Sequence, residues 1–282
     1  MTPQTILITG ATSGIGRAAA LALARRGHRV FATGRREERL RALEQEGRGI
    51  EGIALDVTDA ASIAQVKAEI DRRTEGRGVD VLINNAGYGQ PGPQEMVTDA
   101  EVRAQYETNV FGVLAMTRAF LPQMRERRSG RIIHVGSVVG VFAFPLFGIY
   151  SSTKFAIEGL TDALRREVRP FGVKVTLIQP GYITTEFDER SAEAAAAHWS
   201  GESPYSAQIQ KMNTVREKQR RNHRSPEIVV RAIVDAVESP RPPRRRMVPW
   251  QDRWGIRLLR WMPAWMADAV IARLTRVTPG EG

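Results

Sequence analysis

Tyr150 and Lys154 are the residues of this sequence whose types and spacing most directly suggest chemistry. They stand four positions apart at the start of a helical pattern, so the phenol and the ammonium are expected on one face, one turn apart. A tyrosine hydroxyl has a reference pKa near ~10, and a neighbouring cation favours its phenolate form. The pair is therefore suited to acid and base chemistry near neutral pH.

Ser137 precedes this pair and follows the apolar run of residues 131–135, which is typical of a buried parallel strand. Ligands bind at the carboxyl ends of the strands in open α/β sheets. A serine at such an end can reach the same carbonyl group as the tyrosine and the lysine. Ser137 is therefore the third candidate catalytic residue.

The elements that must position these residues alternate between strand and helix. Apolar runs typical of strands occupy residues 5–8, 29–33, 52–55, 79–83, 131–135 and 173–178, and a seventh is expected at 244–248. The alternation predicts an α/β fold, a doubly wound (Rossmann-type) seven-stranded parallel sheet with helices on both faces. We expect one catalytic domain over residues 1–250 and a basic, amphipathic helical extension over residues 251–282.

A glycine-rich turn joins the first expected strand to an alanine-rich helix. Glycines let a backbone turn tightly and approach a phosphate, whose charge meets free amides and the positive end of the helix dipole. A purely structural turn is the alternative, but the place at the first strand-to-helix junction favours a dinucleotide site. The residues expected to contact the cofactor here are Gly10, Thr12, Ser13, Gly14, Ile15 and Gly16.

These motifs resemble those of the short-chain dehydrogenase/reductase family over roughly residues 4–250, and the run YSSTKFAIEGLTDALRREV resembles its hydroxysteroid and retinol dehydrogenase branch. The resemblance implies that Ser137 holds the substrate oxygen, Tyr150 transfers the proton, and Lys154 binds the nicotinamide ribose and stabilises phenolate. Asn109, within a helical pattern over residues 99–127, matches the family asparagine that holds a water beside the lysine. A satisfied core amide is the alternative.

The resemblance also implies cofactor contacts at other strand ends. An aspartate binds the adenine edge, the NNAG run forms the floor of the site, and a Pro-Gly-x-x-x-Thr motif contacts the nicotinamide amide. The positions carried over are Asp56, Val57, Asn84, Ala86, Gly87, Pro180, Gly181, Ile183 and Thr184, together with Tyr150 and Lys154. A helix cap at Asp56 and simple turns elsewhere are the alternatives. Asn85 is expected to be structural, and Thr185 is not separated from Thr184 by pattern.

The end of the second expected strand bears on cofactor choice. Enzymes that use NAD usually place an acid here for the ribose diol, and an acid would repel a 2'-phosphate. This chain has Gly34, Arg35 and Arg36 instead. Arginine binds phosphate through a planar fork, so we expect NADP(H). The alternative is that the two arginines merely begin a charged helix.

The amino-acid composition argues against several classes of function. The 282 residues include no cysteine and four histidines without metal-ligand spacing, so no metal is expected. No apolar run approaches the length of a membrane span, and we expect a cytoplasmic protein, with a membrane-peripheral one as the alternative. The net charge is +10, but no nucleic-acid-binding motif accompanies it, and no nucleic-acid partner is expected.

The segment between Ser137 and Tyr150 is almost continuously apolar, which favours a hydrophobic carbonyl or alcohol over a sugar as the substrate. The resemblance suggests a steroid, a retinoid or a long-chain carbonyl compound. It also implies a homodimer or homotetramer and a substrate lid over residues 188–224. The rival function is a non-catalytic NADP-binding regulator of the same fold, against which the complete Ser137, Tyr150 and Lys154 set argues.

The tail carries most of the net charge. Residues 211–282 contain 16 Lys and Arg against 7 Asp and Glu, which is +9 of the chain's +10. From Asp252 onward, a helical pattern places Trp254, Leu258, Trp261 and Trp265 on one face and three arginines on another. Such a helix can lie in a membrane interface. The interpretation we favour is packing on the protein's own substrate cleft or on a partner subunit.

Overall fold

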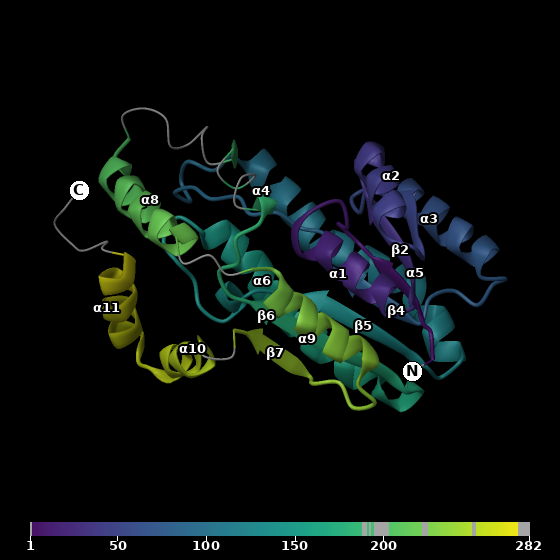
Figure 1. Cartoon of the computed structure of the whole chain (residues 1–282). Coiled ribbons are helices and arrows are strands. Elements are labelled where there is room, and N and C mark those ends of the chain that lie inside the picture. Colours follow the sequence, from purple (N-terminus) through teal and green to yellow (C-terminus); the bar gives the residue numbers. More distant parts are fainter. Residues whose placement is uncertain are drawn as a thin grey trace.

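A parallel sheet forms the centre of the molecule (Figure 1). The computed structural model describes residues 2–187, 191, 193–194, 203–221, 225–249 and 252–275. Its seven strands have the order β3-β2-β1-β4-β5-β6-β7, and every neighbouring pair is parallel. They are β1 (Thr5–Ile8), β2 (Arg29–Gly34), β3 (Ile50–Ala54), β4 (Val81–Asn84), β5 (Gly130–Val135), β6 (Val173–Pro180) and β7 (Arg245–Val248). The predicted doubly wound fold is confirmed.

Helices cover both faces of this sheet. In chain order they include α1 (Gly14–Arg25), α2 (Glu37–Glu46), α3 (Ala60–Arg73), α4 (Asp99–Tyr106), α5 (Gly112–Glu126), α6 (Gly148–Val168) and α9 (Glu227–Glu238). Along β1, Ile6 and Ile8 point into the core shared with α1, α2 and α9, whereas Leu7 points into the core shared with α3, α5 and α6. This two-residue alternation, with apolar side chains on both faces, is expected of a buried parallel strand.

The helix expected over residues 99–127 is interrupted. A five-residue π-helical turn, Glu107–Phe111, separates α4 from α5. It contains Asn109, which is 1% exposed. π-Helical turns often mark functional sites, because the extra residue re-aims the side chains around it.

Three further helices gather at the end of the molecule beyond β7, far from α2 and α3 (Figure 1). They are α8 (Ser206–Arg221), α10 (Asp252–Trp261) and α11 (Ala264–Thr275). Helix α11 contacts α8, and α10 contacts β7. None of the helices in the described part of the chain is long and apolar enough to cross a bilayer.

The turn between β1 and α1 requires glycine at more than one position. Gly10 and Gly14 have φ values of +67° and +53°, which L side chains rarely adopt. Gly16 serves close packing instead. A Cβ atom there would fall well inside van der Waals contact with the Gly10 carbonyl oxygen and the Asn85 amide nitrogen.

We therefore predict that Gly16→Ala destabilises the fold by about 1–3 kcal/mol, because the added methyl group forces α1 away from the turn. Gly159→Ala is the matched control, since nothing lies within 4 Å of a Cβ atom at that helical position. Alanine should be neutral there, or stabilise by up to ~1 kcal/mol. Urea unfolding midpoints of the two variants measure the difference, and equal stability would contradict the packing described.

Candidate active site

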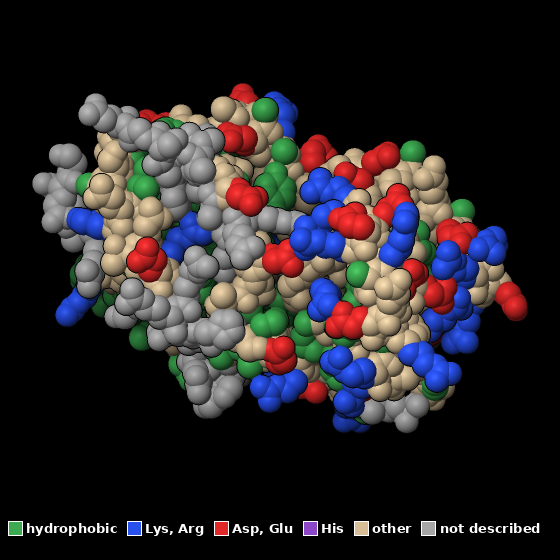
Figure 2. Space-filling model, turned by 45° about the horizontal axis from the view of Figure 1, so that its top comes forward, with side chains coloured by type: hydrophobic (Ala, Val, Ile, Leu, Met, Phe, Trp, Pro, Cys, Tyr) green, Lys and Arg blue, Asp and Glu red, His purple; other side chains and the backbone are tan. Residues whose placement is uncertain are grey.

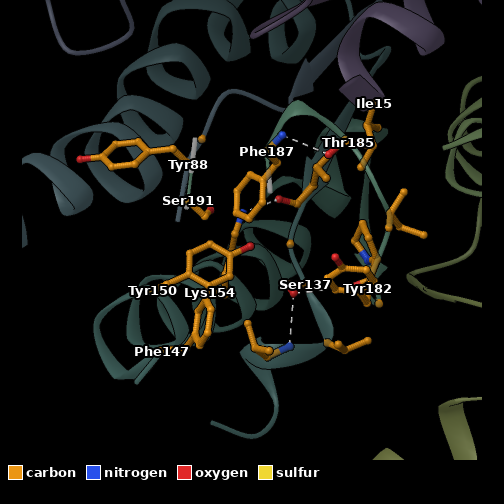
Figure 3. A pocket seen from close by; sticks show the side chains of 18 of the residues that line it. Ile15, Tyr88, Ser137, Phe147, Tyr150, Lys154, Tyr182, Thr185, Phe187 and Ser191 are labelled. Atoms are coloured by element: carbon orange, nitrogen blue, oxygen red, sulfur yellow. Dashed lines mark hydrogen bonds between the residues drawn. The ribbon is translucent and has the colours of Figure 1, made fainter. Parts of the chain in front are cut away.

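One large cavity follows the carboxyl ends of the strands. Its volume is about 1680 Å³, and its wall runs from the glycine turn at Gly10, past Arg35 and Asp56, to Ser137 and Tyr150. The position agrees with the general placement of ligands at the switch point of open α/β sheets, here between β1 and β4. Figure 3 shows the part of this cavity around Tyr150.

The glycine turn and the loop after β4 form one unit. The hydroxyl oxygen of Thr9 accepts hydrogen bonds of 3.0 Å from the backbone N–H groups of Asn85 and Ala86. The Asn85 side-chain amide donates to the carbonyl oxygens of Thr9 and Gly10, at 3.0 and 3.2 Å. A Cβ atom on Gly10 would lie 2.8 Å from the Ala86 Cα atom. This narrow cradle at a helix N-terminus suits the pyrophosphate of a dinucleotide.

Charged groups lie at the end of the cavity next to β2 and β3. The Arg35 guanidinium is 4.0 Å from the Asp56 carboxylate, and its side chain is 73% exposed. Burial acts to raise the pKa of Asp56, but hydrogen bonds from Thr58 and the nearby Arg35 charge outweigh it and hold the pKa below its usual value. Arg36 lies 3.7 Å from Glu186, a carboxylate that Arg39 also contacts. Both Arg35 and Arg36 line the cavity.

The ammonium of Lys154 lies at the other end and is almost completely buried. Lys154 is 8% exposed and donates a hydrogen bond of 3.0 Å to the Val135 carbonyl oxygen at the end of β5. Its nitrogen is 5.7 Å from the centre of the Tyr150 ring. Burial lowers the pKa of Lys154 to about 8. The predicted start of the helix is correct, because α6 begins two residues before Tyr150.

His134 is buried beside this lysine. Burial, reinforced by the Lys154 charge, lowers the pKa of His134 to about 4. Its Nδ1 atom lies 2.8 Å from the Thr161 hydroxyl. At neutral pH the imidazole is therefore uncharged, and it adds no positive charge next to Lys154.

Ser137 and Tyr150 face the same space as Lys154 (Figure 3). The Ser137 hydroxyl accepts a hydrogen bond of 3.3 Å from the Val139 N–H and lies 3.4 Å from the Pro180 carbonyl oxygen. The Tyr150 ring packs against Phe187, with ring centres 5.5 Å apart. The three side chains thus meet between the glycine turn and an apolar surface.

Asn109 lies behind the cavity wall. Its side-chain oxygen accepts a hydrogen bond from the Tyr88 N–H at 3.1 Å, and its amide donates to the Tyr88 carbonyl and the Thr153 hydroxyl, at 2.9 and 3.2 Å. A Cβ atom on Gly87 would lie 3.0 Å from the Asn109 oxygen and 3.9 Å from the Lys154 nitrogen. Asn109 is therefore near the lysine, while its side chain orders the loop after β4.

Most of the residues expected at the cofactor line this cavity, but a few do not. Among the described residues, Gly16, Asn84 and Thr184 are not on its wall. The Asn84 side chain instead donates to the Thr117 hydroxyl on α5, at 3.2 Å. Thr185 takes the wall position next to the turn, since a Cβ atom on Gly14 would lie 3.4 Å from the Thr185 Cβ atom. The placement favours Thr185 over Thr184 as the residue facing the cofactor.

The apolar wall expected between Ser137 and Tyr150 is only partly continuous. Val138, Val139, Phe142, Phe144 and Phe147 line the cavity. Leu146 has φ +63° and is buried against Ile209 and Met212 of α8.

Further wall residues come from segments that the motifs did not single out. They include Tyr88, Phe187, Met212, Ile256, Leu259, Met262 and Ile271. Ile256 and Leu259 are three residues apart on α10, and Met262 directly follows that helix. This three-residue spacing is typical of one helix face and is the sequence signal that could have identified them. The helical extension thus lines the cavity, as the favoured interpretation of the tail expected, while the side chains of Trp254, Trp261 and Trp265 stay exposed. Trp199 and Trp250 lie outside the described residues.

The chain matches the short chain dehydrogenase family over residues 4–196. It is 40% identical over 249 residues to "3-ketodihydrosphingosine reductase" of Bacteroides thetaiotaomicron, covering 88% of each chain. It is 34% identical to human "Retinol dehydrogenase 8", covering 86% of this chain and 81% of that protein.

Solved structures agree with this similarity. A short-chain dehydrogenase from Streptomyces avermitilis superposes with a TM-score of 0.79 and 35% identity, covering 98% of this chain and 96% of that one. A mutant actinorhodin polyketide ketoreductase with NADPH gives a TM-score of 0.74 at 29% identity, covering 87% and 95%. A Burkholderia phymatum short-chain dehydrogenase/reductase with NAD gives 0.77 at 25% identity, covering 91% and 92%. The chain belongs to the short-chain dehydrogenase/reductase family of oxidoreductases.

Proposed function

We propose that this protein is an NADP(H)-dependent oxidoreductase that interconverts a hydrophobic ketone or aldehyde and its alcohol, and that a ketone with a long alkyl chain is its substrate. The observation that carries the proposal is the meeting of Ser137, Tyr150 and buried Lys154 between a dinucleotide cradle and an apolar wall. The names of two relatives support the substrate class, since both refer to compounds with long hydrophobic chains.

The residues would act in the following roles. Gly10, Gly14 and the α1 N-terminus hold the pyrophosphate, and Thr185 and Ile183 lie where the nicotinamide end is expected. NADPH, when bound, supplies the hydride. Ser137 donates a hydrogen bond to the substrate carbonyl oxygen, and Tyr150 gives that oxygen its proton. Asn109 is a positioning residue that acts through Tyr88 and Thr153.

Lys154 supports the proton transfer. Its ammonium, held against the Val135 carbonyl, places a positive charge beside the phenol and favours release of the phenolic proton. The aromatic side chains of Phe142, Phe144, Phe147 and Phe187 exclude water from the carbonyl. The interactions around the proton are then stronger than they would be in bulk water.

On this proposal, residues 1–250 form the catalytic domain, and residues 188–224 form a lid whose described residues include α8, which contributes Met212 and Val215 to the cavity wall. Residues 188–190, 192, 195–202 and 222–224 lie outside the described residues. The extension over residues 251–282 enlarges the apolar surface through Ile256, Leu259 and Met262. A concave apolar surface of this extent suits a long chain better than a compact polar substrate.

We predict that Tyr150→Phe abolishes NADPH-dependent reduction of long-chain ketones, with turnover at least about 10²-fold lower, because no proton donor is left at the carbonyl oxygen. NADPH affinity should stay within a few-fold. Loss of NADPH absorbance over a carbonyl panel, with binding followed by fluorescence, measures both quantities. If the wild-type protein binds NADPH and consumes none, it is the regulatory binding protein and the proposal is wrong.

The reductive rate should fall as the pH rises through about 8, because the lowered pKa of Lys154 means that its ammonium loses its proton there. Below that pH the charge is present and the rate should be flat. Arginine keeps its charge to much higher pH, so residual activity in Lys154→Arg should fall only at higher pH. Identical pH profiles for the two proteins would assign the transition to another group.

Cofactor preference tests the arginine pair. We predict that Arg35→Ala raises the KM for NADPH at least about tenfold and leaves the KM for NADH nearly unchanged, because only NADPH carries the 2'-phosphate. Arg41→Ala is the matched control, since Arg41 is 72% exposed and pairs with Glu37 on α2. Equal changes for both cofactors in Arg35→Ala would refute the NADP assignment.

A further inference from the structure

The two C-terminal helices expose large apolar side chains to solvent. The single helical pattern expected from Asp252 onward is divided at Met262 and Pro263, so three of these side chains lie on α10 and Trp265 lies on α11. Trp254, Leu258, Trp261 and Trp265 are 67, 59, 85 and 72% exposed. We name these four residues the tryptophan face. Exposed apolar side chains gathered in one short segment mark an interaction site, because leaving several indole rings in water is unfavourable.

We propose that the tryptophan face docks on the surface of a lipid bilayer that contains anionic lipids. Indole rings combine an apolar body with a polar N–H group and concentrate at the boundary between headgroups and acyl chains. Helix α10 has ten residues, too few to cross a bilayer, so it would lie in the plane of the interface. The docking itself does not depend on the proposed function. Only its purpose, the supply of a lipid-like ketone to the active site, rests on that function.

Charge supports an anionic surface. The sequence of α10 contains Arg253, Arg257 and Arg260, and residues 211–282 together carry +9. Lysine and arginine near an anionic leaflet each contribute about 1 kcal/mol to binding. Figure 2 shows charged side chains of both signs crowded over the α2–α3 end, and fewer acidic ones among the described side chains at the α8–α11 end.

A second copy of the chain is a weaker candidate for this surface. The oligomer implied by the family resemblance is built on the long helices, and two exposed apolar rings are available there. Phe111, in the π-helical turn before α5, and Phe155, on α6, are 51 and 45% exposed. The tryptophan face lies at the other end of the chain and in a basic segment, where self-association would bring like charges together.

The opposite side of the same helix faces the active site. Ile256 and Leu259 of α10, and Met262 directly after it, line the cavity that contains Tyr150. Leu258 of the tryptophan face also reaches this wall, whereas Trp254, Trp261 and Trp265 do not. Helix α10 would therefore separate the bilayer from the substrate cavity. A long-chain ketone dissolved in the bilayer would reach the apolar wall without crossing bulk water, which holds almost none of it.

Co-sedimentation of the full chain with vesicles tests the docking. At physiological salt the protein should bind vesicles of phosphatidylcholine with phosphatidylglycerol, and binding should weaken as salt is raised. The double variant Trp261→Ser with Trp265→Ser should bind at least about tenfold more weakly, because two indole rings no longer enter the interface. Phe171→Ser removes an exposed ring directly before β6, at the amino-terminal end of the strands and away from the cavity, and should bind like the wild type.

Activity separates this inference from the proposed function. The double variant should reduce a short, water-soluble ketone like the wild type and lose at least about tenfold in rate on a long-chain ketone dissolved in vesicles. A wild-type protein that reduces the soluble ketone but does not bind anionic vesicles overturns the docking and leaves the proposed function intact. A double variant that changes from oligomer to monomer in light scattering, with no vesicle binding by the wild type, assigns the face to a second copy and also overturns it.

Discussion

A buried ammonium held at the end of β5 is the interaction on which the site depends. Removing a charged amine from water is costly unless a polar partner receives it, and here the Val135 carbonyl oxygen does so. That contact fixes α6 against the end of β5. Because Ser137 follows Val135 by two residues and Tyr150 precedes Lys154 by one helical turn, the same contact also brings the serine and the phenol together.

The rest of the sheet places the cofactor cradle opposite this group. β1 and β4 are neighbours at the switch point, and the Thr9 and Asn85 side chains tie their two loops into one unit. The loop after β4 then continues to Gly87 and Tyr88, where Asn109 holds it. The glycine turn and the catalytic residues are thereby linked through hydrogen bonds as well as through the sheet.

The sequence predicts the parts of this arrangement that depend on local periodicity. The strand pattern and the four-residue spacing of Tyr150 and Lys154 lead correctly to the sheet and to the shared helix face. The π-helical turn at Asn109 is not predictable in this way, because one extra residue leaves the apolar pattern of residues 99–127 almost unchanged. The choice between Thr184 and Thr185 was available from the sequence, because the Pro-Gly-x-x-x-Thr spacing counted from Pro180 ends at Thr185. The structure agrees, since Thr185 lies on the cavity wall beside Gly14.

The C-terminal helices show a second kind of feature that the sequence alone does not predict. The sequence shows an amphipathic α10, but its most apolar face by residue type, the one with the tryptophans, points outward and its smaller aliphatic residues face the cavity. Which face of α10 points inward depends on what the helix packs against. Here Ile256 and Leu259 lie on the cavity wall, together with Leu258 and with Met262 directly after the helix. On these proposals one short helix has two functions, a cavity wall on one side and an interaction surface on the other.

The most direct test of the central claim is the titration of Lys154 itself. NMR of protein with 13C-labelled lysine, recorded against pH and assigned by the signal that disappears in Lys154→Arg, reports its protonation without any assay of turnover. The structure predicts a pKa of about 8, because burial disfavours the charged amine. A Lys154 signal that titrates near the ordinary lysine value of ~10.4 would show a solvated amine and would contradict the account.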